Sequence, residues 1–153
     1  MTRPKRPASQ IRPLVAKMTI NGLDAVVMFD TGSTSDAVSP EFARVANMKI
    51  HSLDVLMGIQ LGCKGSKSKI VFGTSGPVQY SSIVRTHYFD VVNIDRFDAI
   101  IGMGFMRKFG ITLEPEHDSI LISGIPAPTL SEGEETVELA RRHSLRRARP
   151  VSH

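Results

Sequence analysis

The 153-residue chain has very little of several features that would assign it to a common class of proteins. Cys63 is its only cysteine, which excludes an intrachain disulfide and a cysteine-rich zinc site. No apolar run approaches the roughly 18 residues of a membrane helix, and no signal-peptide-like segment follows the basic N-terminus. The chain also has no internal repeat. We therefore expect a soluble, intracellular protein, most simply a cytoplasmic one, with no membrane partner.

The net charge of +4 would suggest nucleic-acid binding if it lay on a folded domain. Residues 1–13 carry four basic and no acidic side chains, 14–124 carry ten basic and eleven acidic, and 125–153 carry five basic and four acidic. The near-neutral middle argues against a basic groove, so we expect at most weak nucleic-acid binding through the tails. For the arginine-rich segment 141–147, nuclear import remains open beside a plain solvated tail.

Composition divides the chain into three segments. Residues 1–13 are basic and proline-rich, which predicts a disordered arm. Residues 14–124 alternate short apolar runs with turn residues, which predicts one all-β domain, too short to be a two-lobed protein. Residues 125–153 read as a linker and charged tail, and their acidic start and basic end would suit the dipole of a helix.

Two elements of the domain carry the clearest local signals. Residues 14–20 and 23–29 read as a hairpin, because Asn21-Gly22 accepts the positive φ angles of a tight turn. A serine cap followed by proline and glutamate predicts a short helix over 39–46. The remaining expected elements are a helix over 103–109 and strands at 54–61, 69–72, 78–80, 83–92, 98–101, 111–113 and 119–123.

The motif Asp30-Thr31-Gly32-Ser33 follows an apolar run and places a carboxylate where a buried strand ends. A second apolar strand closed by glycine, residues 98–102, follows about seventy residues later. Peptide hydrolysis by aspartates needs two carboxylates around one water, one ionised to take its proton and one protonated to polarise the carbonyl. Since the chain has one Asp-Thr-Gly, the second carboxylate must come from another copy across a two-fold axis.

The neighbours of Asp30 suit this arrangement. Gly32 lets two backbones approach closely, and the hydroxyls of Thr31 and Ser33 can form hydrogen bonds. A plain turn is the competing interpretation, because these residues are also turn formers.

Other chemistries have little support in the sequence. No G-x-S-x-G motif indicates a serine hydrolase. Phe105, Met106 and Phe109, at helical spacing, are expected in the core rather than in a ligand site. The histidines show no metal-ligand spacing with one another or with Cys63, so we expect no metal site and no cofactor; they are His51, His87, His117, His143 and His153.

The order of these elements, with Asp30-Thr31-Gly32-Ser33 ahead of a glycine-tipped hairpin and Ala99-Ile100-Ile101-Gly102 ahead of a short helix, resembles the retropepsin-like aspartic proteases. The resemblance covers about 14–124. Within that family, residues 59–69 and 88–94 look like the protease region of gypsy-type long-terminal-repeat retrotransposon polyproteins, notably fungal ones.

The resemblance implies an all-β acid-protease half-barrel with one or two short helices and an active site on the two-fold axis of a homodimer. It implies that Asp30 of each protomer forms the catalytic dyad, supported by Thr31, Gly32, Ser33, Ile101 and Gly102. It also implies a flap over an extended polypeptide substrate, formed by Gly62, Cys63, Lys64, Gly65, Ser66, Lys67 and Ser68. The implied reaction is endopeptidase processing of the retrotransposon polyprotein.

One departure from the family keeps an alternative open. Many gypsy-type proteases have an aspartate two residues after the second glycine, where this chain has Gly104. The alternative is a noncatalytic dimerisation or peptide-binding module derived from a retroelement. A third hypothesis, attachment to nucleic acid through the basic arms, predicts binding that weakens steeply with salt.

Overall fold

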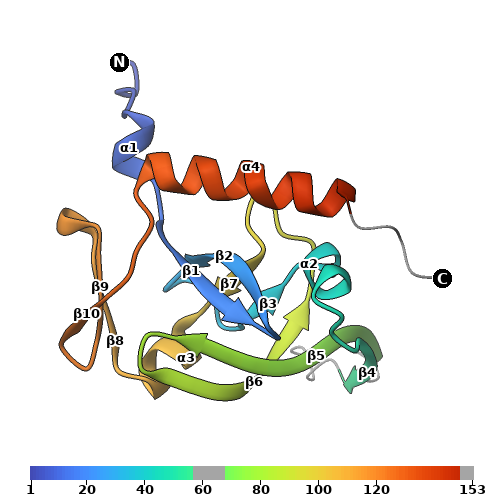
Figure 1. Ribbon diagram of the computed structural model, residues 1–153. Helices are drawn as coiled ribbons and strands as arrows, with labels where there is room; N and C mark the ends of the chain where they lie inside the picture. The colour runs from blue at the N-terminus through green and yellow to red at the C-terminus, as the bar shows by residue number, and fades with distance from the viewer. Residues whose placement is uncertain (57–67, 149–153) are drawn as a thin grey trace, which may run out of the picture.

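The computed structural model describes residues 1–56 and 68–148, which form a mostly β protein with helices around it (Figure 1). The strands are β1 (Leu14–Ile20), β2 (Leu23–Phe29), β3 (Ala37–Val38), β4 (His51–Leu56), β5 (Ser68–Tyr80), β6 (Ile83–Val91), β7 (Ala99–Ile101), β8 (Ile111–Glu114), β9 (Ser119–Ile122) and β10 (Ile125–Ala127). The helices are α1 (Ala8–Ile11), α2 (Pro40–Val45), α3 (Met103–Lys108) and α4 (Glu132–Ala148), with a 3-10 turn at Pro115–His117. The prediction of an all-β fold with short helices is confirmed, and α4 adds a longer one.

One large sheet positions the segments of the Asp-Thr-Gly motif. Its strand order is β1-β2-β7-β3-β6-β5-β4, and an additional pairing of β1 with β5 curls the sheet round on itself. Strands β8, β9 and β10 form a separate antiparallel sheet. Strands β2 and β7 run parallel, with Phe29 opposite Ile101 at their carboxyl ends. The residues that follow these two strands therefore meet at one edge of the sheet.

The hairpin and the first helix form as predicted. Ile20 pairs with Leu23 across the turn, where Asn21 has a φ of 52° and Gly22 a φ of 82°. At the start of α2, Ser39 Oγ accepts a hydrogen bond from the Phe42 N–H at 3.0 Å. Both elements follow from local chemistry: a turn that needs positive φ, and a hydroxyl that satisfies a free N–H.

The core lies within the curled sheet and under α2 and α3. Among its largest fully buried side chains are Phe42, Phe89 and Phe105, and burial of each contributes roughly 1.5–3 kcal/mol. Phe105 and Met106 of α3 lie in this core as predicted, with Phe109 packed against its edge.

Strand β5 is longer than the sequence suggested. The pattern predicted two separate strands, at 69–72 and 78–80. In the structure one strand runs from Ser68 to Tyr80, paired with β4 along its first half and β6 along its second. Gly73 serves packing rather than turning, because the Tyr88 ring occupies the space that a Cβ would need.

Strand β4 also starts earlier than predicted, at His51 rather than residue 54. Its pairing with β5 explains this, because His51 already lies opposite Gly73. Residues 57–61 of the predicted strand lie outside the described residues.

The helix that the charge pattern of the tail suggested is present as α4, but the two ends of the chain belong to the folded unit instead of forming a disordered arm and a separate tail. Residues 8–11 form one helical turn, and residues 125–148 add β10 and α4 to the folded unit. Helix α4 lies across the curled sheet, with α1 beside its first turn (Figure 1). Ser131 and Glu134 form a capping box at its start, with N–H to oxygen distances of 3.2 and 3.0 Å between them. Within the part of the chain that the structure describes, no helix has both the length and the apolar character of a membrane span.

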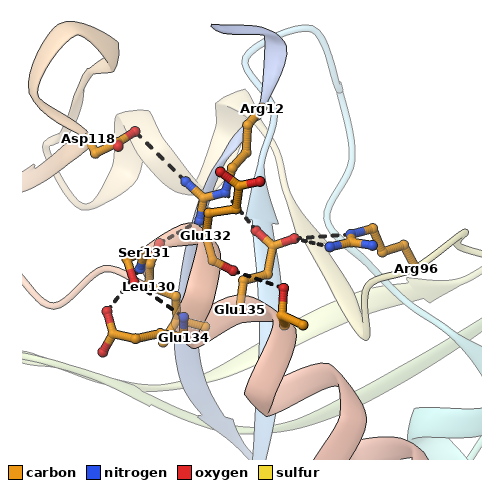
Figure 2. A network of polar contacts seen from close by, with 9 residues as sticks. Arg12, Arg96, Asp118, Leu130, Ser131, Glu132, Glu134 and Glu135 are labelled. Atoms are coloured by element: carbon orange, nitrogen blue, oxygen red, sulfur yellow. Dashed lines mark hydrogen bonds and ion pairs between the residues drawn. The ribbon is translucent and has the colours of Figure 1, made fainter. Parts of the chain in front are cut away.

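Charged side chains hold α4 in place (Figure 2). Glu135, whose side chain is 3% exposed, accepts hydrogen bonds from Arg12 Nε at 3.0 Å and from Arg96 Nη2 at 2.7 Å. Two turns further along α4, Arg142 Nε lies 3.2 Å from Oδ2 of the buried Asp98. The arm, the turn before β7 and the tail are thus joined by ion pairs between residues far apart in the sequence.

Tyr80, at the end of β5, supports a prediction about alkaline pH. It is buried and donates a hydrogen bond to Pro128 O at 2.6 Å, and burial raises its pKa above the ordinary value of about 10. The folded state therefore keeps this proton at a pH where the unfolded chain releases it. Its contribution to stability is complete below about pH 10 and is lost above it.

We expect Tyr80→Phe to lower the free energy of unfolding by about 1 kcal/mol at pH 7, through the lost hydrogen bond. The variant should also lose less stability than the wild type between about pH 9 and 11. Urea denaturation across this range measures both effects. Tyr88→Phe is the control for the effect at pH 7 alone, because Tyr88 is exposed, while its pKa is also raised by burial and by Asp90. Identical alkaline slopes for wild type and Tyr80→Phe would contradict the prediction.

Candidate active site

Asp30 lies directly after β2, and its carboxylate is oriented by its own loop. The Asp30 N–H donates to Ile101 O at 2.9 Å, which anchors the residue to the end of β7. Its Oδ1 accepts the Gly32 N–H at 2.9 Å, and its carbonyl oxygen accepts the Ser33 N–H at 3.1 Å. Such side-chain contacts to the backbone two residues on are typical of aspartate in a turn. The carboxylate is thereby held at the edge of the sheet.

The segment after β7 fits closely under this loop. A Cβ on Gly102 would lie 2.7 Å from Ser33 O and 2.8 Å from Ser35 O, so only glycine fits there without a shift of the backbone. The Met103 N–H donates to Ser33 O at 3.0 Å. The predicted residues Asp30, Thr31, Gly32, Ser33, Ile101 and Gly102 are thus brought together at one place.

The outer side of the loop is open to solvent. Thr31, Gly32, Thr34 and Ser35 are exposed, and Asp30 is half-buried beneath them. A single chain thus presents one oriented carboxylate on an exposed surface. This geometry is compatible with the approach of a second copy and with an added carboxylate opposite the first.

The predicted flap falls largely beyond what can be described. Strands β4 and β5 form the antiparallel arms of a hairpin, with Leu56 opposite Ser68 at its described end. The other expected flap residues, Gly62, Cys63, Lys64, Gly65, Ser66 and Lys67, lie outside the described residues.

Two residues beside the loop were not singled out from the sequence as site residues. Asp36 accepts the Gly102 N–H through Oδ1 at 2.7 Å, and its Oδ2 lies 2.7 Å from His87 Nε2. The His87 ring meets the edges of Phe89 and Phe105, with centroids 5.1 and 4.9 Å away. No spacing rule links residues 36 and 87, so no sequence signal could have found this pair.

A separate cavity of about 530 Å³ lies between the β5–β6 turn, α3 and β9. Its lining includes Arg85, Arg107 and Lys108 and none of the residues of the Asp30 loop. This is a local concentration of positive charge that the near-neutral total of 14–124 does not reveal. Among residues 1–56 and 68–148, histidine, cysteine, aspartate and glutamate side chains form no group of three that could hold a metal ion.

Comparison with solved structures shows the same fold in other proteins. The retroviral protease-like domain of Ddi1 from Leishmania major is 16% identical, with a TM-score of 0.56 over 80% of this chain and 97% of that one. A retropepsin-like aspartic protease from Rickettsia conorii is 19% identical, with a TM-score of 0.50 over 76% of this chain and 84% of that one. At these identities the likeness concerns the fold alone. A search of curated protein sequences gives no match.

The family comparison covers the part of the chain that carries the site. Residues 8–126 match the family described as retroviral aspartyl protease, a span that contains β1 to β9, the Asp30 loop and the Gly102 segment. Fold, motif order and family match agree, and the chain therefore belongs to the retroviral aspartyl protease family.

Proposed function

We propose that this protein is an aspartic endopeptidase that works as a homodimer, with Asp30 of each protomer forming the catalytic dyad. The observation that carries the proposal is the Asp30 loop itself. It holds a carboxylate through Gly32 and Ile101, on an exposed surface, in a chain that belongs to the aspartyl protease family.

The proposed reaction uses the two carboxylates in different protonation states. Like charges this close do not both ionise, so one carboxylate stays protonated. The ionised one takes a proton from water while the protonated one polarises the carbonyl of the substrate. The water oxygen bonds to the carbonyl carbon, the carbon–nitrogen bond breaks, and the departing nitrogen takes the proton that the carboxylate had accepted from water. Thr31 and Ser33 would stabilise the loop around this centre.

The proposed substrate is an extended polypeptide bound as an added strand beneath a flap at 62–68. Closure of the flap would exclude water and align the scissile bond. The resemblance to gypsy-type proteases makes the polyprotein of such a retrotransposon the proposed natural substrate. This finer assignment rests on the sequence patterns at 59–69 and 88–94.

Dependence of the rate on protein concentration tests the shared site. The purified protein is incubated with an unbiased peptide mixture at several concentrations, from mildly acidic to neutral pH, and products are identified by mass spectrometry. Because two copies make one site, the rate should rise with about the square of concentration while monomers dominate and become linear once dimers do. The mass of the protein, measured in the same samples, locates that change.

Two results would count against the proposal. A rate strictly proportional to concentration in samples that contain only monomer would exclude a dyad shared between copies. No cleavage by a sample shown to be dimeric would favour the noncatalytic peptide-binding module, which should then bind extended peptides without turnover.

A further inference from the structure

We infer that Asp36 and His87 are positioning residues that hold the Asp30 loop against the Gly102 segment through a hydrogen bond donated by His87 Nε2. The effect of this pair on catalysis rests on the proposed function. The contact itself does not.

Asp36 uses its two carboxylate oxygens for two different elements. Oδ1 accepts the backbone N–H of Gly102 at 2.7 Å, and Oδ2 receives His87 Nε2, from the middle of β6, at 2.7 Å. The backbone oxygen of Asp36 accepts the Asp90 N–H at 2.9 Å. The side chains of Asp36 and His87 are only 12% and 15% exposed. Asp36 therefore ties the end of the Asp30 loop to β6 and to the residue after β7.

The Asp36 carboxylate determines which ring nitrogen of His87 carries the hydrogen. An ionised carboxylate can only accept hydrogen bonds, so His87 Nε2 must carry the hydrogen. T-shaped contacts of the His87 ring with Phe89 and Phe105 limit the rotation of the imidazole. Of the contacts described for the His87 ring, those with Phe89 and Phe105 are apolar and that with Asp36 is charged. Without the donor, the Asp36 carboxylate keeps its hydrogen bond from the Gly102 N–H but loses the contact that fixes its orientation.

Rotation of the Asp36 side chain would affect Asp30 through the segment 101–103. The 101–103 segment accepts the Asp30 N–H through Ile101 O and donates to Ser33 O through the Met103 N–H. Since Ser33 O and Ser35 O fill the space where a Cβ of Gly102 would lie, a shift of Gly102 toward the loop would displace these two carbonyl groups. Displacement of a reacting group by 1 Å can reduce the rate by about 10²-fold, so a smaller shift should still be measurable.

Two amide variants of His87 separate the effect of losing the hydrogen bond from the effect of replacing the imidazole ring. In His87→Gln the side-chain nitrogen can reach the position of Nε2, whereas in His87→Asn it reaches only that of Nδ1. We expect His87→Asn to lower kcat about tenfold with KM changed less than about twofold, because positioning acts in the transition state. His87→Gln should stay within about threefold of the wild type in kcat, since it restores the donor.

Hydrogen exchange at the Gly102 amide is measured on the same proteins by NMR and needs no proteolysis. Its exchange should be at least about tenfold faster in His87→Asn than in the wild type, and nearly unchanged in His87→Gln. Thermal unfolding shows whether each variant folds. If His87→Asn does not, the ¹⁵N shifts of His87 in the wild type test the same claim. Nitrogen Nε2 must carry hydrogen, and an unprotonated Nε2 would overturn the inference.

The two proposals fail in different ways. If both variants exchange Gly102 like the wild type, or if both lose kcat equally, the positioning role is overturned whether or not the protein cleaves peptides. If the wild type cleaves nothing while Gly102 exchange rises in His87→Asn and not in His87→Gln, the positioning role stands and the protease assignment fails.

Discussion

Asp30→Asn is expected to lower kcat/KM for peptide cleavage by about 10²–10⁴-fold while the protein still folds and dimerises. Asparagine has the size of aspartate but cannot take a proton from water. Its amide oxygen can still accept the Gly32 N–H that Asp30 Oδ1 accepts at 2.9 Å, so the loop keeps its shape. Steady-state kinetics on a peptide found in the mixture screen give the loss, and thermal unfolding verifies the fold.

Asp24→Asn is the matched control for this variant. Asp24 lies on β2, the strand that Asp30 follows, is half-buried and contacts Thr19 and Lys17 rather than the loop. We expect its kcat/KM to stay within about twofold of the wild type. Cleavage by Asp30→Asn at the wild-type rate would overturn the assignment of Asp30.

Mixing wild type and Asp30→Asn in equal amounts makes the test specific to a shared site. Above the dimer dissociation constant, random pairing leaves about one quarter of the dimers with two aspartates. The activity should therefore be about one quarter of that of wild type at the same total protein concentration. Two independent monomeric enzymes would give one half. A value of one half would therefore contradict the dyad even if Asp30 is essential.

Glu135→Gln is expected to lower the free energy of unfolding by about 3 kcal/mol, the largest stability loss we predict. Removal of its charge leaves the guanidinium of Arg12, only 10% exposed, with the distant and exposed Asp118, 3.9 Å away, as its remaining carboxylate partner among the described residues. Arg96 is 55% exposed and can be solvated instead, so most of the loss should come from Arg12. Urea denaturation at pH 7 measures the change.

Glu132→Gln serves as the control for Glu135→Gln. Glu132 lies on the first turn of the same helix and is exposed, and its backbone oxygen keeps the hydrogen bond from Thr136. The control should change stability by about 0.5 kcal/mol or less. Equal losses from the two variants would contradict a special role for the buried carboxylate.

Much of the candidate site could be predicted because its chemistry is local. Asp30-Thr31-Gly32 follows an apolar strand, and the glycine after β7 stands at the end of another apolar run. Their meeting follows from the parallel pairing of β2 with β7, with Phe29 opposite Ile101, which only the structure shows. The role of Asp36 could not be predicted, because its partners His87 and Gly102 are distant in the sequence.

Strand β5 shows a different limit of sequence reasoning. Glycine and proline between apolar runs usually interrupt a strand, and the expected strands at 69–72 and 78–80 leave out the residues between them. Gly73 is in fact required by the Tyr88 side chain on the neighbouring strand, which lies 15 positions away in the sequence. Local propensity cannot distinguish a glycine that turns the chain from one that makes room for a neighbour.

The sequence by itself determined the β1–β2 hairpin, the caps of α2 and the identity of the candidate catalytic residue, because each depends on residues adjacent in the chain. Only the tertiary structure decided that residues 125–148 pack onto the sheet. The buried face of α4 carries Glu135 and Arg142, so hydrophobic periodicity gives no sign of burial. Charges enter the interior when partners neutralise them, and here the partners are Arg12, Arg96 and Asp98, which only folding brings to the helix.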